Sequence, residues 1–332
     1  MSLREKIVVH GHTGLLGSAI VQKLKKEGRG SLILKTHREL DLTDAHRVNQ
    51  FYSVYEPTQI YLCAAKVGGM YANIETPADF ISENLSIQNN VLQAAWHYGV
   101  HKLLFVASAA VYPEKKETCS EEDLLTGKLD MTKAAYGIAK IAGIQECLAF
   151  NKQHHTKFIS VIPNNLYGIG DNFNPSTSHV VPGIIRKIHE AKINKLPTCE
   201  MWGSGNAKRE LIFNEDAADA CIFLMNNKET PLDTPVNIGV GYDVTIKLLA
   251  NTLAEIIGYD GTLTWNDTFE EGTQRRLLNI DKIKKLGWKP TTSLMNGLKE
   301  TYLYWLGTLD PKDHCYIDAE KELMNILSES LY

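Results

Sequence analysis

Three residues of the sequence have the types and spacing needed to reduce a carbonyl group. Tyr136 and Lys140 are four residues apart, so on a helix they share one face. An ammonium group near a phenol favours the phenolate, which would ease proton transfer to a ketone oxygen while hydride reaches the carbon. Ser108 follows an apolar run and could donate to the same oxygen as it gains negative charge. Taken alone, a Tyr-x-x-x-Lys pair is more often an ordinary surface pair, so the interpretation needs a hydride source.

A glycine-rich segment near the N-terminus indicates such a source. Gly11, Gly14 and Gly17 follow the apolar run 7–9 and lead into a helical pattern over 18–27. Glycines at this spacing let the chain turn sharply and bring backbone N–H groups against a pyrophosphate at a helix N-terminus. The spacing is GxxGxxG, and an ordinary strand-to-helix turn is the alternative. With the strand before it and the helix after it, the segment predicts a dinucleotide site.

The residues after the second apolar run, 31–34, indicate which dinucleotide binds. An NAD enzyme carries Asp or Glu roughly twenty residues after the glycines, where it binds the adenosine ribose. This chain has Lys35, His37 and Arg38 there instead. These side chains would hold a 2′-phosphate, although a solvated basic loop is the alternative. We therefore expect NADPH or NADP as the cofactor.

The elements that must position these groups alternate along the first half of the chain. Apolar runs at 7–9, 31–34, 60–63, 102–107 and 157–162 are separated by helical patterns at 18–27, 45–55, 83–98 and 136–153. Strands that are apolar throughout and separated by helices predict a parallel sheet covered on both faces, hence an α/β, doubly wound Rossmann fold. The segment 236–241 is expected to be a loop before a helix over 245–257.

The alternation breaks near residue 169, which suggests a second lobe. We expect residues 1–168 and about 210–245 to form an NADPH-binding domain. Residues of about 169–209 and 246–310 would form a smaller mixed α/β lobe that binds substrate, and 311–332 a C-terminal helical tail.

Composition excludes several classes of protein. The 332 residues contain 35 Lys+Arg and 39 Asp+Glu, a net charge of −4, which offers no general attraction to nucleic acid or an anionic membrane. No stretch approaches the ~20 apolar residues of a membrane-spanning helix, and we expect a cytoplasmic protein. The six cysteines have neither disulfide-framework nor zinc-site spacing, so we expect no metal.

Further segments support a resemblance to one family. They are 64–69, 77–80, 136–143, 165–168, 171–173, 178–182, 202–205 and 209–210. With the glycine loop, the serine and the Tyr/Lys pair, they resemble the GDP-L-fucose synthase family of extended short-chain dehydrogenase/reductases. That family uses NADPH to epimerise and reduce GDP-4-keto-6-deoxymannose. The resemblance covers nearly all of residues 5–305.

The resemblance implies a set of site residues. Catalytic residues would be Ser108, Tyr136, Lys140 and His179. Cofactor-binding residues would be Gly11, Thr13, Gly14, Leu15, Leu16, Gly17, Lys35, His37, Arg38, Asp41, Leu42, Ala64, Ala65, Lys66, Tyr136, Lys140, Pro163, Asn165, Leu166 and His179. Substrate-binding residues would be Asn165, His179, Arg186, Lys187, Trp202, Arg209 and Arg276, with Arg209 at the GDP diphosphate. A homodimer through helices near 83–98 and 136–153 is also implied.

One position departs from the family. Its members carry a cysteine two residues after the serine, paired with the histidine that matches His179, and this chain has Ala110. Inversion beside a ketone needs a base and an acid on opposite faces of the ring, and alanine cannot exchange a proton. We therefore expect reduction at C4 of a GDP-4-keto-6-deoxy hexose or heptose, with epimerisation at C3 and C5 lost.

Alternatives remain open at this stage. One alternative is that Ala110 is an introduced substitution in a bifunctional GDP-L-fucose synthase, and another is that Cys119 replaces the missing base. A nucleotide-sugar 4-epimerase and a protein that binds NADPH without turnover are lesser alternatives. Neither fits all of the features above, because the segment at 35–38 is cationic and both Tyr136 and Lys140 are present.

Overall fold

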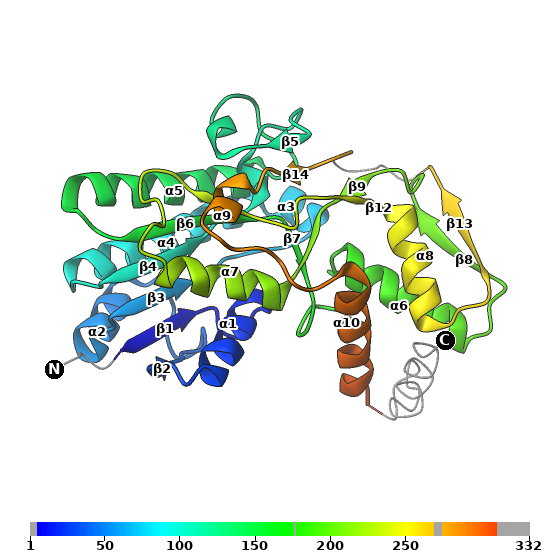
Figure 1. Ribbon diagram of the computed structural model, residues 1–332, viewed down its shortest axis with the longest axis horizontal. Helices are drawn as coiled ribbons and strands as arrows, with labels where there is room; N and C mark the ends of the chain where they lie inside the picture. Colours follow the sequence, from blue (N-terminus) through cyan, green and yellow to red (C-terminus); the bar gives the residue numbers. More distant parts are fainter. Residues whose placement is uncertain (1–4, 176, 269–273, 311–332) are drawn as a thin grey trace.

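A sheet of six parallel strands forms the centre of the larger lobe. The structure is a computed structural model, and it describes residues 5–175, 177–268 and 274–310. The strand order is β11-β6-β4-β3-β1-β2. The bounds are β1 (Lys6–His10), β2 (Ser31–Ile33), β3 (Gln59–Leu62), β4 (Lys102–Val106), β6 (Phe158–Pro163) and β11 (Val236–Ile238) (Figure 1).

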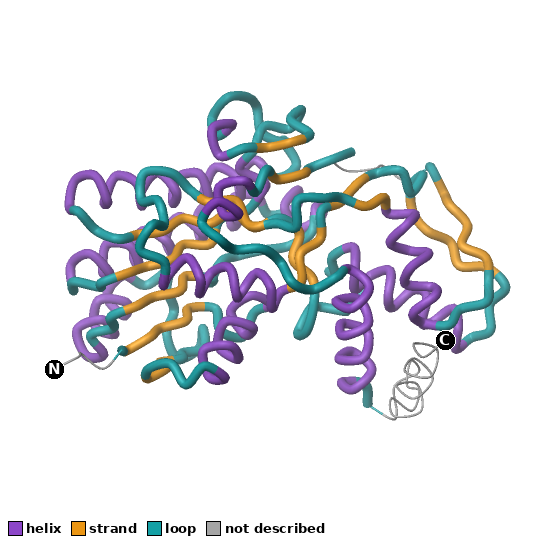
Figure 2. Tube along the Cα trace, in the orientation of Figure 1, coloured by secondary structure: helices purple, strands orange, loops and turns teal. Residues whose placement is uncertain are grey.

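Helices cover both faces of this sheet. On one face α1 (Leu15–Lys26) packs against α7 (Asn214–Asn226). On the other, α4 (Pro77–His97) contacts both α2 (Ala45–Tyr55) and α5 (Ala134–His154). Figure 2 shows the helices as layers with the strands between them. The doubly wound α/β fold expected from the sequence is therefore present.

The order of the strands reverses at β1, which has β2 on one side and β3 on the other. In open parallel sheets, ligands bind outside the carboxyl ends of the strands at such a switch point. A ligand is therefore expected to bind directly after His10 of β1 and Leu62 of β3.

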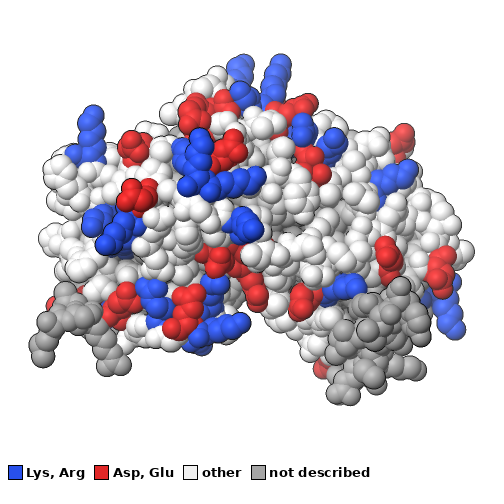
Figure 3. Space-filling model, in the orientation of Figure 1, with Lys and Arg blue, Asp and Glu red and all other residues white. Residues whose placement is uncertain are grey.

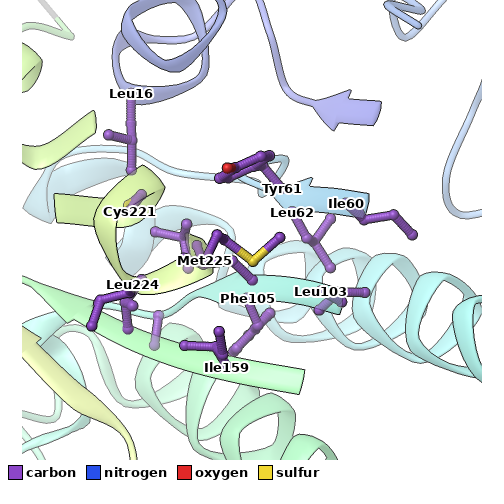
Figure 4. Packing of buried hydrophobic residues seen from close by; sticks show 14 of the residues in the cluster. Leu16, Ile60, Tyr61, Leu62, Leu103, Phe105, Ile159, Cys221, Leu224 and Met225 are labelled. Atoms are coloured by element: carbon purple, nitrogen blue, oxygen red, sulfur yellow. The ribbon is translucent and has the colours of Figure 1, made fainter. Parts of the chain in front are cut away.

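Apolar side chains from the sheet and α7 form the larger core. Cys221, Leu224 and Met225 of α7 pack towards Tyr61 of β3 and Phe105 of β4 (Figure 4). Phe105 is 1% exposed, and burying one such side chain stabilises the fold by about 1.5–3 kcal/mol. This core holds the carboxyl ends of the strands in fixed positions.

A second core forms the smaller lobe, at the right in Figure 1. Its helices are α6 (Val180–Ile193), α8 (Ile246–Ile257) and α10 (Leu294–Thr308), and its strands β8 (Thr198–Trp202) and β13 (Thr262–Asn266) pair in parallel. Ile185 of α6, Leu249 of α8 and Leu298 of α10 are each 0% exposed. Gly258, with φ +67°, ends α8 in a left-handed conformation that glycine adopts without strain.

Short strand pairs lie between the two cores. β7 (Asn165–Tyr167) pairs in parallel with β10 (Leu211–Phe213), and β9 (Lys208–Arg209) pairs with β12 (Val244–Thr245). A third pair, β5 (Thr118–Cys119) with β14 (Leu277–Leu278), belongs to the larger lobe, and Cys119 and Leu278 are part of its core. The remaining elements are α3 (Met70–Glu75), η1 (Ala109–Val111), η2 (Glu121–Asp123) and α9 (Asp281–Lys285).

The structure differs from the sequence-based expectations at two segments, and a third expectation falls outside the residues that it describes. Residues 236–238, expected in a loop, form β11, because Val236 and Ile238 are buried beside β6. The segment 277–288, assigned to the smaller lobe, packs in the larger core through Leu278, Ile283 and Trp288. The expected helical tail at 311–332 lies outside the described residues.

Charged side chains of both signs are interspersed on the face drawn in Figure 3, in keeping with the small net charge. Among the helices of the described ranges, none has the length and apolar character of a membrane span.

Candidate active site

The glycine turn after β1 forms a close-packed backbone surface. Gly11 has φ +81°, and a Cβ placed on it would lie 2.6 Å from the Ala64 nitrogen. A Cβ on Gly17 would lie 2.1 Å from the Gly11 oxygen. Thr13 and Gly14 are exposed at the start of α1, where the first backbone N–H groups lack intrahelical partners. This turn fits a pyrophosphate at the helix N-terminus.

The segment after β3 lies against the glycine turn. The Cys63 nitrogen donates to the His10 oxygen over 3.0 Å, which brings Ala64 and Ala65 alongside. The Lys66 backbone exchanges two hydrogen bonds of 3.0 Å with Asn84 of α4. Its ammonium pairs with Glu83 at 2.7 Å and Asp79 at 3.6 Å. In this structure Lys66 therefore anchors its loop to α4 rather than presenting a free cation.

The segment after β2 presents basic side chains at the surface. His37 and Arg38 are both exposed, and His37 lies 4.0 Å from Asp41. Lys35 instead pairs with Glu39 at 3.2 Å, with its ammonium over the Tyr55 ring. Leu42, like Leu16 of α1, has its side chain in the larger core, so either residue can offer a cofactor only its backbone.

The carboxyl end of β4 and the first turns of α5 bring the predicted reduction centre together. Lys140 is 3% exposed, and its ammonium donates to the Val106 oxygen over 2.8 Å. Two residues beyond Val106, the Ser108 Oγ accepts from the Ala110 N–H over 3.3 Å. Ser108 also acts on the half-buried Tyr136 phenol, where it lowers the pKa of the hydroxyl. The three groups predicted from the sequence thus meet at one place.

Burial controls the proton affinities of this centre. It raises the pKa of Tyr136 to about 12, while Ser108 acts in the opposite direction. It lowers the pKa of Lys140 from 10.5 to about 8. The Lys140 Nζ lies 5.9 Å from the centre of the Tyr136 ring. Desolvation therefore dominates in this state, and Tyr136 holds its proton near neutral pH.

Arg276 contacts backbone oxygens in the segment that follows Ser108. It is 9% exposed, and its guanidinium donates to the oxygens of Tyr112, at 3.0 Å, and Ala109, at 3.4 Å. These hydrogen bonds fasten the turn that carries Ser108, and the expected contact between Arg276 and the nucleotide stays a prediction. The helix α5 also packs on this turn, since a Cβ on Gly137 would lie 2.8 Å from the Ala110 oxygen.

The remaining cations expected at the substrate come from the smaller lobe and β9. Arg186 pairs with Glu190 at 2.7 Å and donates to the Phe173 oxygen, so its guanidinium is engaged within the lobe. The Lys187 ammonium lies 5.1 Å from the centre of the Trp202 ring, and Trp202 is 60% exposed. Arg209 donates to the Lys208 oxygen over 2.7 Å.

The residues after β6 lie beside a buried carboxylate. Pro163 is buried at the end of β6, and Leu166 packs against the larger core. Asn165 is exposed, and its Nδ2 donates to the Glu210 backbone oxygen over 3.0 Å. The Glu210 carboxylate is 0% exposed and accepts from the Asn164 side chain. Asn165 is thus held at the boundary between the lobes.

Lys133 is a residue that the sequence analysis missed. It precedes α5, is half-buried, and interacts electrostatically with Arg209 and Arg276, which lower its pKa together with the larger effect of burial. His179, exposed at the start of α6, has a pKa lowered first by desolvation and then by Lys133. In the sequence, the position of Lys133 three residues before Tyr136 was the signal that could have indicated a role at the site.

In the described ranges there is no group of three or more His, Cys, Asp or Glu side chains able to hold a metal ion. The site therefore consists of a backbone cradle, a Ser/Tyr/Lys centre and a group of cations from both lobes.

Comparison with known proteins assigns the family. A model of the NAD dependent epimerase/dehydratase family matches residues 7–239. GDP-L-fucose synthase 1 of Arabidopsis thaliana is 47% identical over 302 residues, covering 91% of this chain and 93% of that protein. The chain belongs to the GDP-L-fucose synthase family. The resemblance drawn from the sequence motifs is thereby confirmed.

Two solved structures of similar proteins share the fold over more than nine-tenths of this chain. A GDP-6-OMe-4-keto-L-xylo-heptose reductase from Campylobacter jejuni matches with a TM-score of 0.86 and 34% identity, over 93% of this chain and 99% of that one. MlghC, a GDP-mannoheptose C4 reductase from the same species with NADP bound, matches with a TM-score of 0.84 and 36% identity, over 92% and 99%.

Proposed function

We propose that this protein reduces the C4 ketone of a GDP-linked 4-keto-6-deoxy sugar, a hexose or a heptose, with NADPH. The observation that carries the proposal is the meeting of Ser108, Tyr136 and Lys140 after β4, in the same sheet as the glycine turn after β1. The relatives named above, a fucose synthase and two GDP-heptose reductases, support this substrate class.

The protein's own groups divide the work of reduction. Tyr136, protonated near neutral pH, donates its proton to the C4 oxygen. Ser108 donates a hydrogen bond to the same oxygen as charge develops. Lys140 then stabilises the phenolate that remains and holds the nicotinamide ribose. When bound, NADPH supplies the hydride.

The cradle observed after β1 fits this cofactor. Gly11 and Gly17 leave no room for a side chain, so backbone atoms of the turn can approach a pyrophosphate. His37 and Arg38 are exposed after β2, where they would attract the 2′-phosphate. We therefore assign both the glycine turn and this basic segment to NADPH.

We further propose that the protein does not epimerise its substrate. Ala110 lacks a group that can exchange a proton. Cys119 is no replacement, because it is 0% exposed, its Sγ donates to the Lys116 oxygen, and burial raises its pKa. The substrate must then come from a separate epimerase, or need no inversion.

Product analysis tests both parts of this proposal. The purified protein would be incubated in deuterated water with NADPH and a GDP-4-keto-6-deoxy hexose or heptose, each with and without prior epimerisation. We expect NADPH consumption without deuterium at C3 or C5. Tyr136→Phe should lose about 10²–10⁴-fold in rate and still bind NADPH, while the matched variant Tyr304→Phe, on the exposed surface of α10, should behave as wild type.

A bifunctional epimerase and reductase is the second candidate, since desolvation and then Lys133 lower the pKa of His179 and leave it a neutral imidazole that can accept a proton. Deuterium at C3 or C5 of the product would establish it. Return of the hydride with no net NADPH loss would indicate a 4-epimerase, and binding of NADPH without any turnover a non-catalytic protein.

We also propose that the protein is a cytoplasmic homodimer. The exposed surface of α4 and α5 carries Leu85, Trp96 and Ile138, which are 36%, 43% and 49% exposed. A hollow of about 320 Å³ between these helices is lined by Leu85, Ser86, Gln88, Asn89, Ala142 and Glu146. The free thiols among the described cysteines suit a reducing compartment.

A further inference from the structure

Lys133 lies where basic side chains from four segments of the chain come together. It precedes α5, and its electrostatic neighbours are Arg209 of β9, Arg276 before β14, and His179 before α6. Asp130 is an acidic neighbour of Lys133, and its carboxylate accepts hydrogen bonds from the Thr132 N–H and hydroxyl at 3.0 and 2.7 Å. Basic side chains from separate segments of the chain therefore gather around Lys133.

The backbone fixes Lys133 close to the reduction centre. The Gly137 N–H donates to the Lys133 oxygen over 2.9 Å, so these two residues are one helical turn apart on the same side of α5. At Gly137 that side touches the Ala110 oxygen. Lys133 thus lies within one helical turn of Tyr136. It is also one helical turn from Gly137, where α5 contacts the segment that carries Ser108.

Folding alone gives no reason for a lysine at this position. A cation at a helix N-terminus opposes the helix dipole, and α5 has 21 residues with no acidic side chain in its first turn. Burial disfavours the charged form of Lys133 and lowers its pKa, the Asp130 carboxylate opposes this shift, and Arg209 and Arg276 add to it. An anionic ligand would offset these costs.

We propose that Lys133 binds the diphosphate of the nucleotide-linked substrate, together with Arg209. The inference rests on the proposed function, which puts a nucleoside diphosphate sugar in this site. A lysine contributes a compact point charge and a guanidinium a planar pair of donors, so the two can bind different oxygens of one diphosphate. Lys133 directly precedes α5, and Arg209 belongs to β9. A diphosphate bound by both side chains would therefore connect the reduction centre with the strands between the lobes.

Equilibrium binding tests the assignment without depending on turnover. GDP, GMP and NADPH would each be titrated by calorimetry into the wild-type protein, Lys133→Gln, Lys133→Arg and the control Lys128→Gln. Lys128 is exposed in the same loop, five residues before Lys133. We expect Lys133→Gln to weaken GDP about 10- to 100-fold, since a hydrogen bond to a charged group is lost. GMP should be weakened less, NADPH should be unaffected, and Lys133→Arg should recover part of the GDP affinity.

Two outcomes would overturn the assignment. Unchanged GDP affinity in Lys133→Gln would remove Lys133 from the diphosphate site, and an equal loss for GDP, GMP and NADPH would indicate a general structural effect. Neither result bears on C4 reduction, which is measured separately by NADPH oxidation with the keto sugar. Conversely, if no GDP-4-keto sugar is reduced while GDP binding still depends on Lys133, the nucleotide assignment holds and the proposed reaction fails.

Discussion

Lys140 is enclosed by the protein, with its ammonium hydrogen-bonded to the Val106 oxygen. A lysine usually keeps its charge well beyond neutral pH, but burial lowers the pKa of Lys140 to about 8. Below that pH the ammonium predominates, and above it the neutral amine. The charge that would stabilise the Tyr136 phenolate after proton transfer is therefore present only on the acidic side.

The dependence of turnover on pH should show this titration. We expect kcat/KM for the keto sugar to fall as the pH rises through about 8, because the neutral amine no longer stabilises the phenolate. Steady-state rates between pH 6 and 10 measure the effect. Lys140→Met should be slow throughout and lack this decline. A wild-type profile that stays level to pH 10 would contradict the role of Lys140.

Several segments depend on one buried carboxylate between the lobes. Glu210 accepts from the N–H groups of Val240 at 2.7 Å, Gly241 at 2.8 Å and Leu278 at 2.8 Å. A Cβ on Gly239 would lie 2.3 Å from its Oε1, so the chain after β11 passes directly over the carboxylate. Glu210 thus joins three parts of the chain: β10, the segment after β11, and β14.

Glu210→Gln should destabilise this junction. The amide would place N–H donors against backbone N–H groups, and a buried group without a partner costs about 1–3 kcal/mol. Urea unfolding should show a lower midpoint, whereas the exposed variant Glu229→Gln should unfold as wild type. Equal midpoints in the two variants would show that the junction does not depend on the carboxylate.

Two hydrophobic cores with short strand pairs between them make up the molecule. The larger core fixes the glycine turn and the Ser/Tyr/Lys centre, and the smaller core carries His179, Lys187 and Trp202. Because α4 and α5 pack side by side, their exposed apolar residues form a single surface outside both cores.

Disruption of that surface should change the oligomeric state. We expect the wild-type protein to sediment as a dimer and Ile138→Asp with Leu85→Asp to sediment as a monomer, since a buried unpaired charge opposes association. The control Leu248→Asp changes a residue that is 52% exposed on α8 and should remain dimeric. A double variant with the mass of the wild type would place the interface elsewhere.

The glycine spacing, the apolar strands and the order Ser108, Tyr136, Lys140 were sufficient to predict the fold and the reduction centre. These signals are local: a turn that excludes side chains, a strand buried on both faces and a helix that puts residues four apart on one side. The family resemblance extended the same signals to NADPH, and NADP is bound in one of the solved relatives.

Long-range packing decided the rest. β11 becomes a strand because β6 supplies its partner, and Arg276 is drawn to the carbonyl oxygens of Ala109 and Tyr112, more than 160 residues earlier in the chain. Lys133 meets Arg209 and His179 because the strands between the lobes bring three distant segments together. Burial also determined the pKa of Tyr136, since desolvation depends on everything that surrounds a side chain and a sequence motif records only its nearest neighbours.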